Sequence, residues 1–461
     1  MPLVTRMRAR RPQTSERPTL LTRGVDLYAF LLGCTTLFSV HIVGELYWAE
    51  ILLLCAFPLL IVTKGRMALA LRPELRPIYA LMGFWLVGLV ISDAYNGTPW
   101  TDRIRGTALI LFFAINIMGM SIFFGGQEKR KILYFVGLMV AALASVIVTP
   151  SEASASYPWK FGYAWGTIQL VLLVSSYFYS RGRYVVSGLL VLGICAVNLL
   201  LNFRSPVLGL LVTLVLVFPI VPESLGGMRI LPRSQGLRLM VLAVFAIGAA
   251  ETAGGLVSFV TRAGYIDEEA QAKNEAQEKG GLLFGGRPEF LIGLKAALDS
   301  PIIGHGSWAK DPKYYEMLND ALVESGAQPE QIGGDILSEE GNPLIPGHSQ
   351  IINSWIWAGI AGPIFWLYAL WFFLRGMMRV AILRPPLAPF LMWFLISTWW
   401  DIFFSPFAAN RRIIEALMIV VVADVLGKKV AAPRSWRRLG AITPIRSFAQ
   451  GGNPMSPIRS R

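Results

Sequence analysis

The stretch from Gly106 to Phe124 reads GTALILFFAINIMGMSIFF and contains no charged side chain. A helix needs about 20 mainly apolar residues to cross the hydrocarbon core of a bilayer, so this run predicts a membrane-spanning helix. The rest of the chain has the same character. Of its 461 residues, 54% are hydrophobic and 15% are charged, and the mean hydropathy is +0.53. Soluble proteins carry about 25% charged residues, so the composition excludes a chain of several soluble domains.

Apolar runs of this kind recur along the chain and predict an all-α polytopic membrane bundle of about twelve transmembrane helices. Charged residues or Gly/Pro clusters bound each run. The first run follows a basic stretch but has no small-residue cleavage site after it, so we expect an anchoring span. The runs lie near residues 25–43, 46–62, 78–93, 106–124, 132–149, 161–179, 184–202, 205–222, 239–260, 349–374, 387–405 and 411–426.

The distribution of basic residues predicts the orientation of these spans. With the N-terminus in the cytoplasm, the seven cytoplasmic pieces contain 29 Lys or Arg residues and the five short outward loops contain only six. The positive-inside rule requires this asymmetry, which places both termini in the cytoplasm. The formal net charge of +13 is therefore attributed to orientation signals and contacts with lipid headgroups rather than to nucleic-acid binding.

The predicted organisation has five parts. A basic cytoplasmic tail (1–24) precedes spans 1–9 (25–260), and a large outward loop (261–346) precedes spans 10–12 (347–426) and a second basic tail (427–461). The loop carries seven basic and fifteen acidic side chains, and long loops of this kind often carry function. Within it we expect helices over 288–299 and 313–325, and a polar helix over 266–279.

No residue pattern indicates a metal or a cofactor. The cysteines all fall inside apolar runs, and neither they nor the histidines have metal-ligand spacing. Gly280 to Gly286 is rich in glycine but lacks the following Lys-Ser/Thr of a nucleotide-binding loop. We therefore expect a mechanism without metal or cofactor. The residues concerned are Cys34, Cys55, Cys195, His41, His305 and His348.

Two arginines on the outward side are candidate anion ligands. Arg204 ends the seventh span, where its guanidinium must face water, a carboxylate or an anionic ligand. An interfacial arginine reaching toward headgroups is the alternative. Arg287 directly precedes a predicted helix N-terminus at Pro288, a position whose exposed N–H groups favour an anion such as diphosphate. A salt bridge within the loop is the alternative for Arg287.

His348 is the candidate proton acceptor. It lies where the large loop re-enters the membrane as the tenth span. Imidazole can take a proton from a hydroxyl near neutral pH, and a position at the membrane surface allows contact with both a lipid-linked donor and a water-side acceptor. A helix-capping or packing role is the alternative for a lone histidine at this place.

Four further arginines lie at the outward ends of other spans. Guanidinium groups make bidentate contacts with phosphate oxygens, so these side chains are candidate substrate-binding residues. They are Arg103, Arg105, Arg411 and Arg412.

Three segments together resemble the superfamily of O-antigen ligases and O-antigen polymerases, which are GT-C type integral-membrane glycosyltransferases. The first segment is Asn202-Phe203-Arg204-Ser205. The second runs from Gly286-Arg287-Pro288-Glu289-Phe290 to Asp299-Ser300-Pro301-Ile302-Ile303-Gly304-His305-Gly306. The third runs from His348-Ser349-Gln350-Ile351-Ile352-Asn353 to Ala358-Gly359-Ile360-Ala361-Gly362. The resemblance covers about residues 160–425. Ser349 stands where the family usually has Asn, and Ile352 where it has Leu.

The resemblance implies an enzyme of the bacterial inner membrane with a periplasmic site. Such enzymes move a glycan from an undecaprenyl diphosphate carrier to an acceptor hydroxyl, without nucleotide sugar and without metal. Arg204 and Arg287 would stabilise the diphosphate leaving group, and His348 would orient or deprotonate the acceptor. The implied partners are the lipid-linked oligosaccharide, an acceptor glycan or lipid A core, membrane lipids, and polysaccharide export or copolymerase proteins. Nucleic acid is not expected.

Several functions remain open from the sequence. The preferred one is a polymerase of a surface polysaccharide such as exopolysaccharide, capsule or O-antigen, and a ligase to lipid A core or protein differs only in the acceptor. A transporter or flippase for lipid-linked sugars is a different class, as is a non-catalytic assembly partner. Aromatic residues of the outward loop, namely Trp308, Tyr314 and Tyr315, are candidates for stacking on sugar rings or for helix packing.

Overall fold

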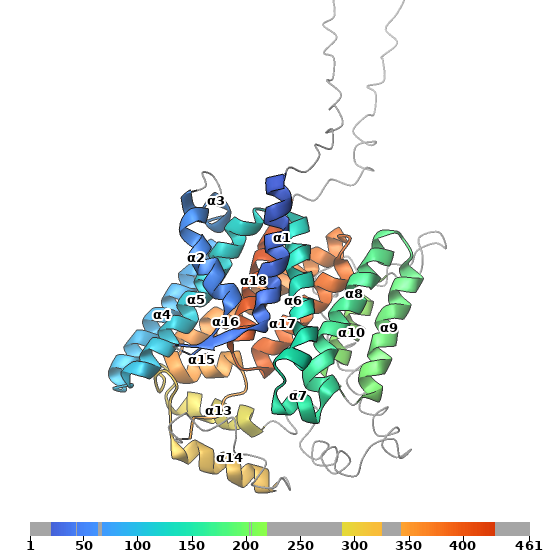
Figure 1. Ribbon diagram of the computed structural model, residues 1–461. Coiled ribbons are helices and arrows are strands. Elements are labelled where there is room, and N and C mark those ends of the chain that lie inside the picture. The colour runs from blue at the N-terminus through green and yellow to red at the C-terminus, as the bar shows by residue number, and fades with distance from the viewer. Residues whose placement is uncertain are drawn as a thin grey trace, which may run out of the picture. The chain divides into compact units, whose positions relative to one another are not determined.

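The computed structural model describes residues 20–42, 44–62, 67–201, 203, 205–218, 288–324 and 343–428. Those up to Gly427 belong to one compact unit and are helical apart from a two-stranded hairpin, short turns and loops (Figure 1). The helices of the N-terminal half are α1 (Leu20–Cys34), α2 (Trp48–Val62), α3 (Met67–Ala70), α4 (Arg76–Tyr95), α5 (Trp100–Phe124), α6 (Glu128–Val148) and α7 (Glu152–Ser156). The later ones are η2 (Trp159–Tyr163), α8 (Ala164–Ser180), α9 (Tyr184–Leu200), α10 (Ser205–Val217), α13 (Pro288–Asp299), α14 (Pro312–Glu324), α15 (Gln350–Ala358), α16 (Ala361–Leu383), α17 (Ala388–Phe404) and α18 (Ala409–Gly427).

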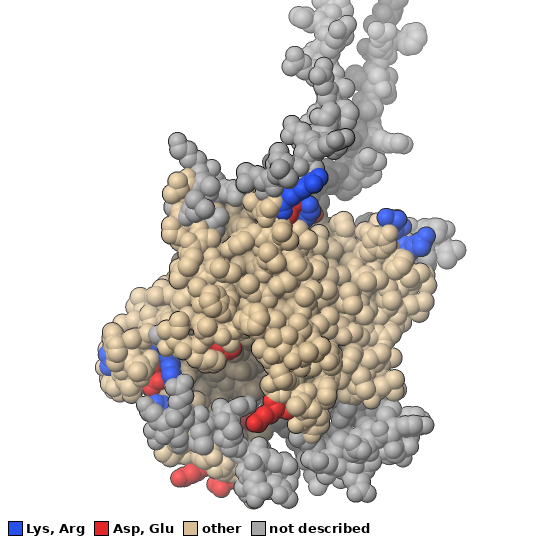
Figure 2. Space-filling view, viewed as in Figure 1, with Lys and Arg blue, Asp and Glu red and all other residues tan. Residues whose placement is uncertain are grey.

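Five of the described helices are long and apolar enough to cross a membrane: α4, α5, α6, the continuous η2–α8 segment and α16. Shorter apolar helices occur at Trp48–Pro58, Tyr184–Leu200, Ser205–Val217 and Ala388–Phe404. Figure 2 shows basic side chains at the end of the unit where α1 and α6 begin, with a wide band of uncharged surface next to them. The chain is therefore a helical membrane-embedded protein. The count of twelve spans and the placement of the termini stay predictions, and the ninth predicted span (239–260) lies outside the described residues.

Two predicted spans differ from the structure. Residues 25–43 do not form one helix, because α1 ends at Cys34 and a hairpin of β1 (Ser39–His41) and β2 (Glu45–Tyr47) follows a 3-10 turn. The hydroxyls of Thr35 and Thr36 donate to the carbonyls of Leu32 and Gly33 at 2.8 and 2.7 Å. Such local bonds favour a helix end over its continuation.

The predicted tenth span, 349–374, is two helices. α15 ends at Ala358, and Gly359 has a φ of 60° before α16 begins at Ala361. The interruption has a tertiary cause: the Ile302 carbonyl comes so close that a Cβ on Gly359 would lie 1.9 Å from it. It accepts a hydrogen bond from the N–H of Ile360 at 3.3 Å. Since this partner comes from a distant segment, the sequence of the span alone did not reveal the break.

The helices expected in the outward loop are confirmed by α13 and α14, whereas the expected helix over 266–279 lies outside the described residues. In Figure 1, α13 and α14 lie beyond one end of the long helices, on the same side as α7. The described part of the loop therefore forms helices packed at one end of the bundle.

Close helix packing holds α1 against α6. A Cβ on Gly137 would lie 2.2 Å from the Phe30 carbonyl oxygen and 2.9 Å from the Gly33 Cα. Small residues that let helix backbones approach this closely are a common packing device in membranes. The contact leaves no room for a methyl group on either helix.

We therefore expect Gly137→Ala to destabilise the bundle by about 2 kcal/mol, the typical effect of overpacking. The measurement is the midpoint of thermal unfolding in detergent. Gly83→Ala is the matched control, because Gly83 lies inside α4 and a Cβ there would have no atom within 4 Å, and alanine favours helix by about 0.5–1 kcal/mol. Equal midpoints for the two variants would contradict the close contact.

Candidate functional site

The Pro-x-x-Gly-x-Gly turn at residues 301–306 docks onto α15. The N–H of His305 donates to the Ile356 carbonyl at 2.6 Å. Gly304 has a φ of 85°, and a Cβ there would lie 2.6 Å from the Gly359 nitrogen. Only glycine allows this backbone approach. The second and third motif segments, which lie far apart in the sequence, are therefore one packed unit.

Helix α13 packs against the residues that lead into α15. A Cβ on Gly293 would lie 2.7 Å from the Pro346 carbonyl oxygen and 3.3 Å from the Gly347 Cα. The Nε2 atom of His305 lies 2.8 Å from the Ala296 carbonyl oxygen, so the same helix also contacts the turn. Helix α13 thus contacts both the glycine turn and the entry to α15, where His348 lies.

His348 is exposed at the start of α15. The next residue, Ser349, is buried and is the N-cap of the helix. Its hydroxyl accepts from the Ile352 N–H at 3.4 Å and lies 3.2 Å from the Ile402 carbonyl, to which it donates. This serine therefore caps α15, a role that asparagine can also perform. The cap holds the backbone next to His348 in place while the imidazole stays accessible.

The C-terminal end of α4 and the loop that follows it contact the other side of the glycine turn. Asp93 is buried, and its carboxylate accepts from the Ser307 N–H at 2.6 Å and from the Ser307 hydroxyl at 2.9 Å. The Asn96 amide donates to the Gly304 carbonyl at 3.2 Å. Thr98 fills the space beside Gly306, whose Cβ would lie 2.2 Å from the Thr98 hydroxyl oxygen. The C-terminal end of α4 and the residues that follow it therefore position the glycine turn.

Two of the predicted substrate-binding arginines lie in the first turns of α5, and they differ in their partners. Arg105 Nη1 lies 3.9 Å from Asp102, whose other oxygen lies 3.1 Å from Lys310 Nζ. Arg103 Nε donates to the Thr98 carbonyl at 2.6 Å. Among the described residues, no carboxylate pairs with Arg103. The Arg103 guanidinium is therefore held through Nε, and no carboxylate of the described residues neutralises its charge.

The other two predicted arginines open α18. Arg411 Nη1 lies 2.5 Å from Asp401, and its guanidinium lies over the Trp165 ring. Arg412 is buried at 3% exposure and binds both carboxylate oxygens of Glu50, at 2.7 and 2.5 Å. Their charges are therefore compensated inside the protein. A diphosphate would have to displace Glu50 to reach Arg412.

Arg204 and Arg287 lie outside the described residues, so their side chains are not placed. Their neighbours are. Phe203 is buried, and its N–H donates to the Asn198 carbonyl at 2.8 Å. Pro288, directly after Arg287, begins α13. The structure thus brings the helix that follows Arg287 to the entry of α15.

The sequence did not predict the buried acidic residues, two of which are Glu50 and Glu415. Glu50 accepts from Arg412, from the Asn116 amide at 2.7 Å and from the Tyr47 N–H at 3.1 Å. Glu415 accepts from the Gln350 amide at 2.5 Å in a buried pair. A lone carboxylate inside an apolar run was the available signal, because an acidic group in a membrane helix needs a partner.

Two of the three predicted aromatic residues, Tyr314 and Trp308, pack within the protein. The Tyr314 hydroxyl donates to Asp299 at 2.7 Å, and Tyr314 is buried. This bond, with Lys295 and Lys313, holds the pKa of the Asp299 carboxyl well below its usual range. Trp308 stacks on Trp357 with ring centroids 4.5 Å apart. These contacts join α13, α14 and α15.

Within the described part of the chain, no group of three or more His, Cys, Asp or Glu side chains could hold a metal ion. Comparison with known proteins adds no identification: no protein-family model and no curated protein matches this chain.

Proposed function

We propose that the protein is a membrane glycosyltransferase of the O-antigen ligase and polymerase kind. It transfers a glycan from an undecaprenyl diphosphate carrier to an acceptor hydroxyl at the periplasmic face of the bacterial inner membrane. The preferred acceptor is another lipid-linked repeat, so that the product is a surface polysaccharide. A lipid A core or protein acceptor would make the enzyme a ligase.

One observation supports this proposal most directly. The glycine turn of the second motif segment and α15 of the third are joined by the bond from His305 N–H to Ile356 and by the contact between Gly304 and Gly359. The resemblance rested on motifs from separate parts of the sequence. Motifs that are far apart in the sequence would have to pack together in this way if they form one site, and the exposed His348 lies at the other end of the same helix.

The reaction assigns a role to each residue. The acceptor oxygen forms a bond to the anomeric carbon as the bond from that carbon to the diphosphate oxygen breaks, and the electron pair leaves with the carrier diphosphate. His348 takes the proton of the acceptor hydroxyl. Arg287 and Arg204 stabilise the charge that develops on the leaving group. No metal or cofactor is assigned a step.

Purified protein in liposomes with a lipid-linked oligosaccharide tests this proposal. New glycosidic bonds, detected as longer glycans on the carrier, support a polymerase. Glycan transferred only to added lipid A core supports a ligase. Movement of the intact lipid-linked sugar across the bilayer without bond formation supports a transporter and contradicts the proposal. No new bond and no movement would favour an assembly partner.

The interruption between α15 and α16 resembles the broken helices of transporters, so its position along the span bears on the choice between a transporter and a glycosyltransferase. Transporter helices break near the bilayer midplane at the substrate site. Here α16 alone has 23 residues and is long enough to span, so the break lies at one end of a complete span. This position fits a loop that docks onto a helix end better than a transport site.

A further inference from the structure

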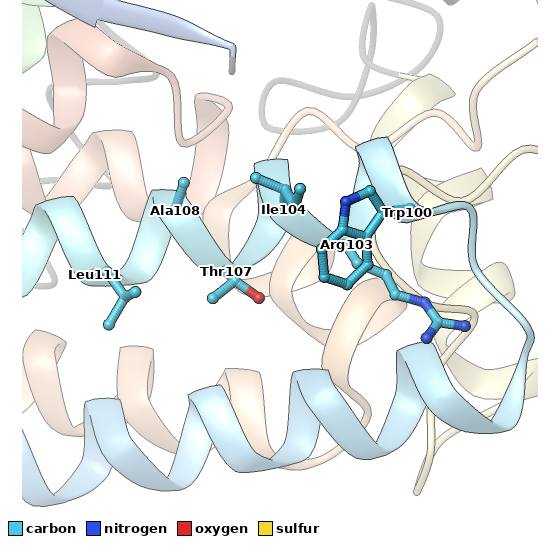
Figure 3. Close-up of a pocket in the computed structure, with 6 residues that line it drawn as sticks. All are labelled: Trp100, Arg103, Ile104, Thr107, Ala108 and Leu111. Atoms are coloured by element: carbon cyan, nitrogen blue, oxygen red, sulfur yellow. The ribbon is translucent and has the colours of Figure 1, made fainter. Parts of the chain in front are cut away.

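One face of α5 forms an open apolar groove at the protein surface. It is lined by Trp100, Arg103, Ile104, Thr107, Ala108 and Leu111, which recur at helical spacing (Figure 3). Trp100 and Leu111 are 72% and 45% exposed. The small side chains of Thr107 and Ala108 lie between the larger ones at the two ends. At 1.5 Å per residue the groove follows about 16 Å of helix.

The groove has a charged end. Figure 3 shows the guanidinium of Arg103 beyond the apolar side chains, at the same end as Trp100. The bond from Nε to the Thr98 carbonyl fixes one edge of the guanidinium, and both Nη groups remain without a hydrogen-bond partner in the described residues. Arg105, Arg411 and Arg412 each have a carboxylate nearby. Arg103 alone of these four presents its charge to a ligand.

We propose that this groove binds the isoprenoid carrier, with Arg103 on its phosphate and the chain along α5. A lipid phosphate with a single chain has an anion at one end of a narrow apolar tail. The apolar face of α5 is one helix face wide and has Arg103 at one end, so it matches this lipid in shape and charge. Arginine binds phosphate through paired N–H groups, and tryptophan prefers the membrane interface. This inference rests on the proposed function, because it names where the carrier lipid lies.

The groove connects to the candidate site through α5 itself. On another side of the same helix, a Cβ on Gly106 would lie 2.2 Å from the hydroxyl oxygen of Ser307. Ser307 follows the glycine turn that packs on α15. Thr98, whose carbonyl holds Arg103, also touches Gly306 of that turn. A lipid phosphate at Arg103 therefore lies beside the loop that contacts the glycine turn, and this turn packs on α15, the helix that follows His348.

Photocrosslinking in nanodiscs tests the groove. The probe is undecaprenyl diphosphate with a photoreactive group on its chain, in a phosphatidylcholine bilayer. We expect Arg103→Gln to lower probe affinity about tenfold, the effect of losing one charge-assisted hydrogen bond. Ala108→Trp fills the groove and is expected to abolish labelling of α5. Ala196→Trp is the matched control, since Ala196 is exposed on α9.

The outcomes separate this inference from the proposed function. If the probe labels α5 equally in the wild type and in both groove variants, the inference is overturned. Displacement of the probe by equimolar phosphatidylglycerol would also overturn it, because that result would indicate general binding of anionic lipids. If wild-type protein makes glycosidic bonds but the label lies on other helices, the groove is wrong and the enzyme stands. If α5 is labelled in an Arg103-dependent way but no bond forms, the transferase proposal fails instead.

Discussion

Replacing His348 by alanine is expected to lower glycan transfer by about 10²- to 10³-fold, within the range that general acid–base catalysis contributes. The amount of folded protein should stay unchanged. His348 is exposed, and the adjacent helix cap is made by the Ser349 hydroxyl rather than by the imidazole. The variant therefore removes a proton acceptor and leaves the cap of α15 in place. The measurement is the initial rate of bond formation by reconstituted protein at equal protein amount.

His41→Ala is the matched control, because His41 is an exposed histidine on the hairpin strand β1. It should retain the wild-type rate. His348→Gln extends the test, since glutamine can hold the acceptor by a hydrogen bond but cannot take its proton at neutral pH. A slow glutamine variant supports deprotonation, and a fast one supports orientation alone. Wild-type rates in the alanine variant would remove His348 from the mechanism.

Glu50→Ala is expected to destabilise the protein by about 3–5 kcal/mol, the effect of leaving one partner of a buried ion pair alone. The guanidinium of Arg412 would then be buried at 3% exposure without its carboxylate. The Asn116 amide and the Tyr47 N–H would lose their acceptor as well. The measurements are the level of protein in the membrane and the midpoint of thermal unfolding in detergent.

The double variant Glu50→Leu with Arg412→Met should be more stable than Glu50→Ala, since replacing both members of a buried pair by apolar residues is often neutral. Glu152→Ala, an exposed acid on α7, is the control and should unfold like the wild type. If Glu50→Ala alone unfolds like the wild type, the pair does not stabilise the fold. Transfer activity in the double variant would also show that Arg412 is not a required substrate contact.

The apolar runs were enough to predict the class of protein and most helices. Residues 106–124 fall inside α5, and residues 288–299 coincide with α13. These predictions succeeded because a long apolar run has few alternatives in a bilayer, and because a proline at the first helical turn is a local signal. The sequence also singled out His348 as a candidate by its place at a predicted span start, and its role stays a prediction.

The tertiary structure decided what the arginines and the helix interruptions do. Whether a guanidinium is free or paired depends on a carboxylate that is distant in sequence, as Glu50 is from Arg412, and no local pattern encodes that pairing. The break at Gly359 likewise comes from the Ile302 carbonyl, which supplies an outside acceptor. Composition and periodicity determined that the chain is a helical membrane protein. Contacts between remote segments decided which of its charges remain available for a ligand, because charge compensation is a property of three-dimensional neighbours.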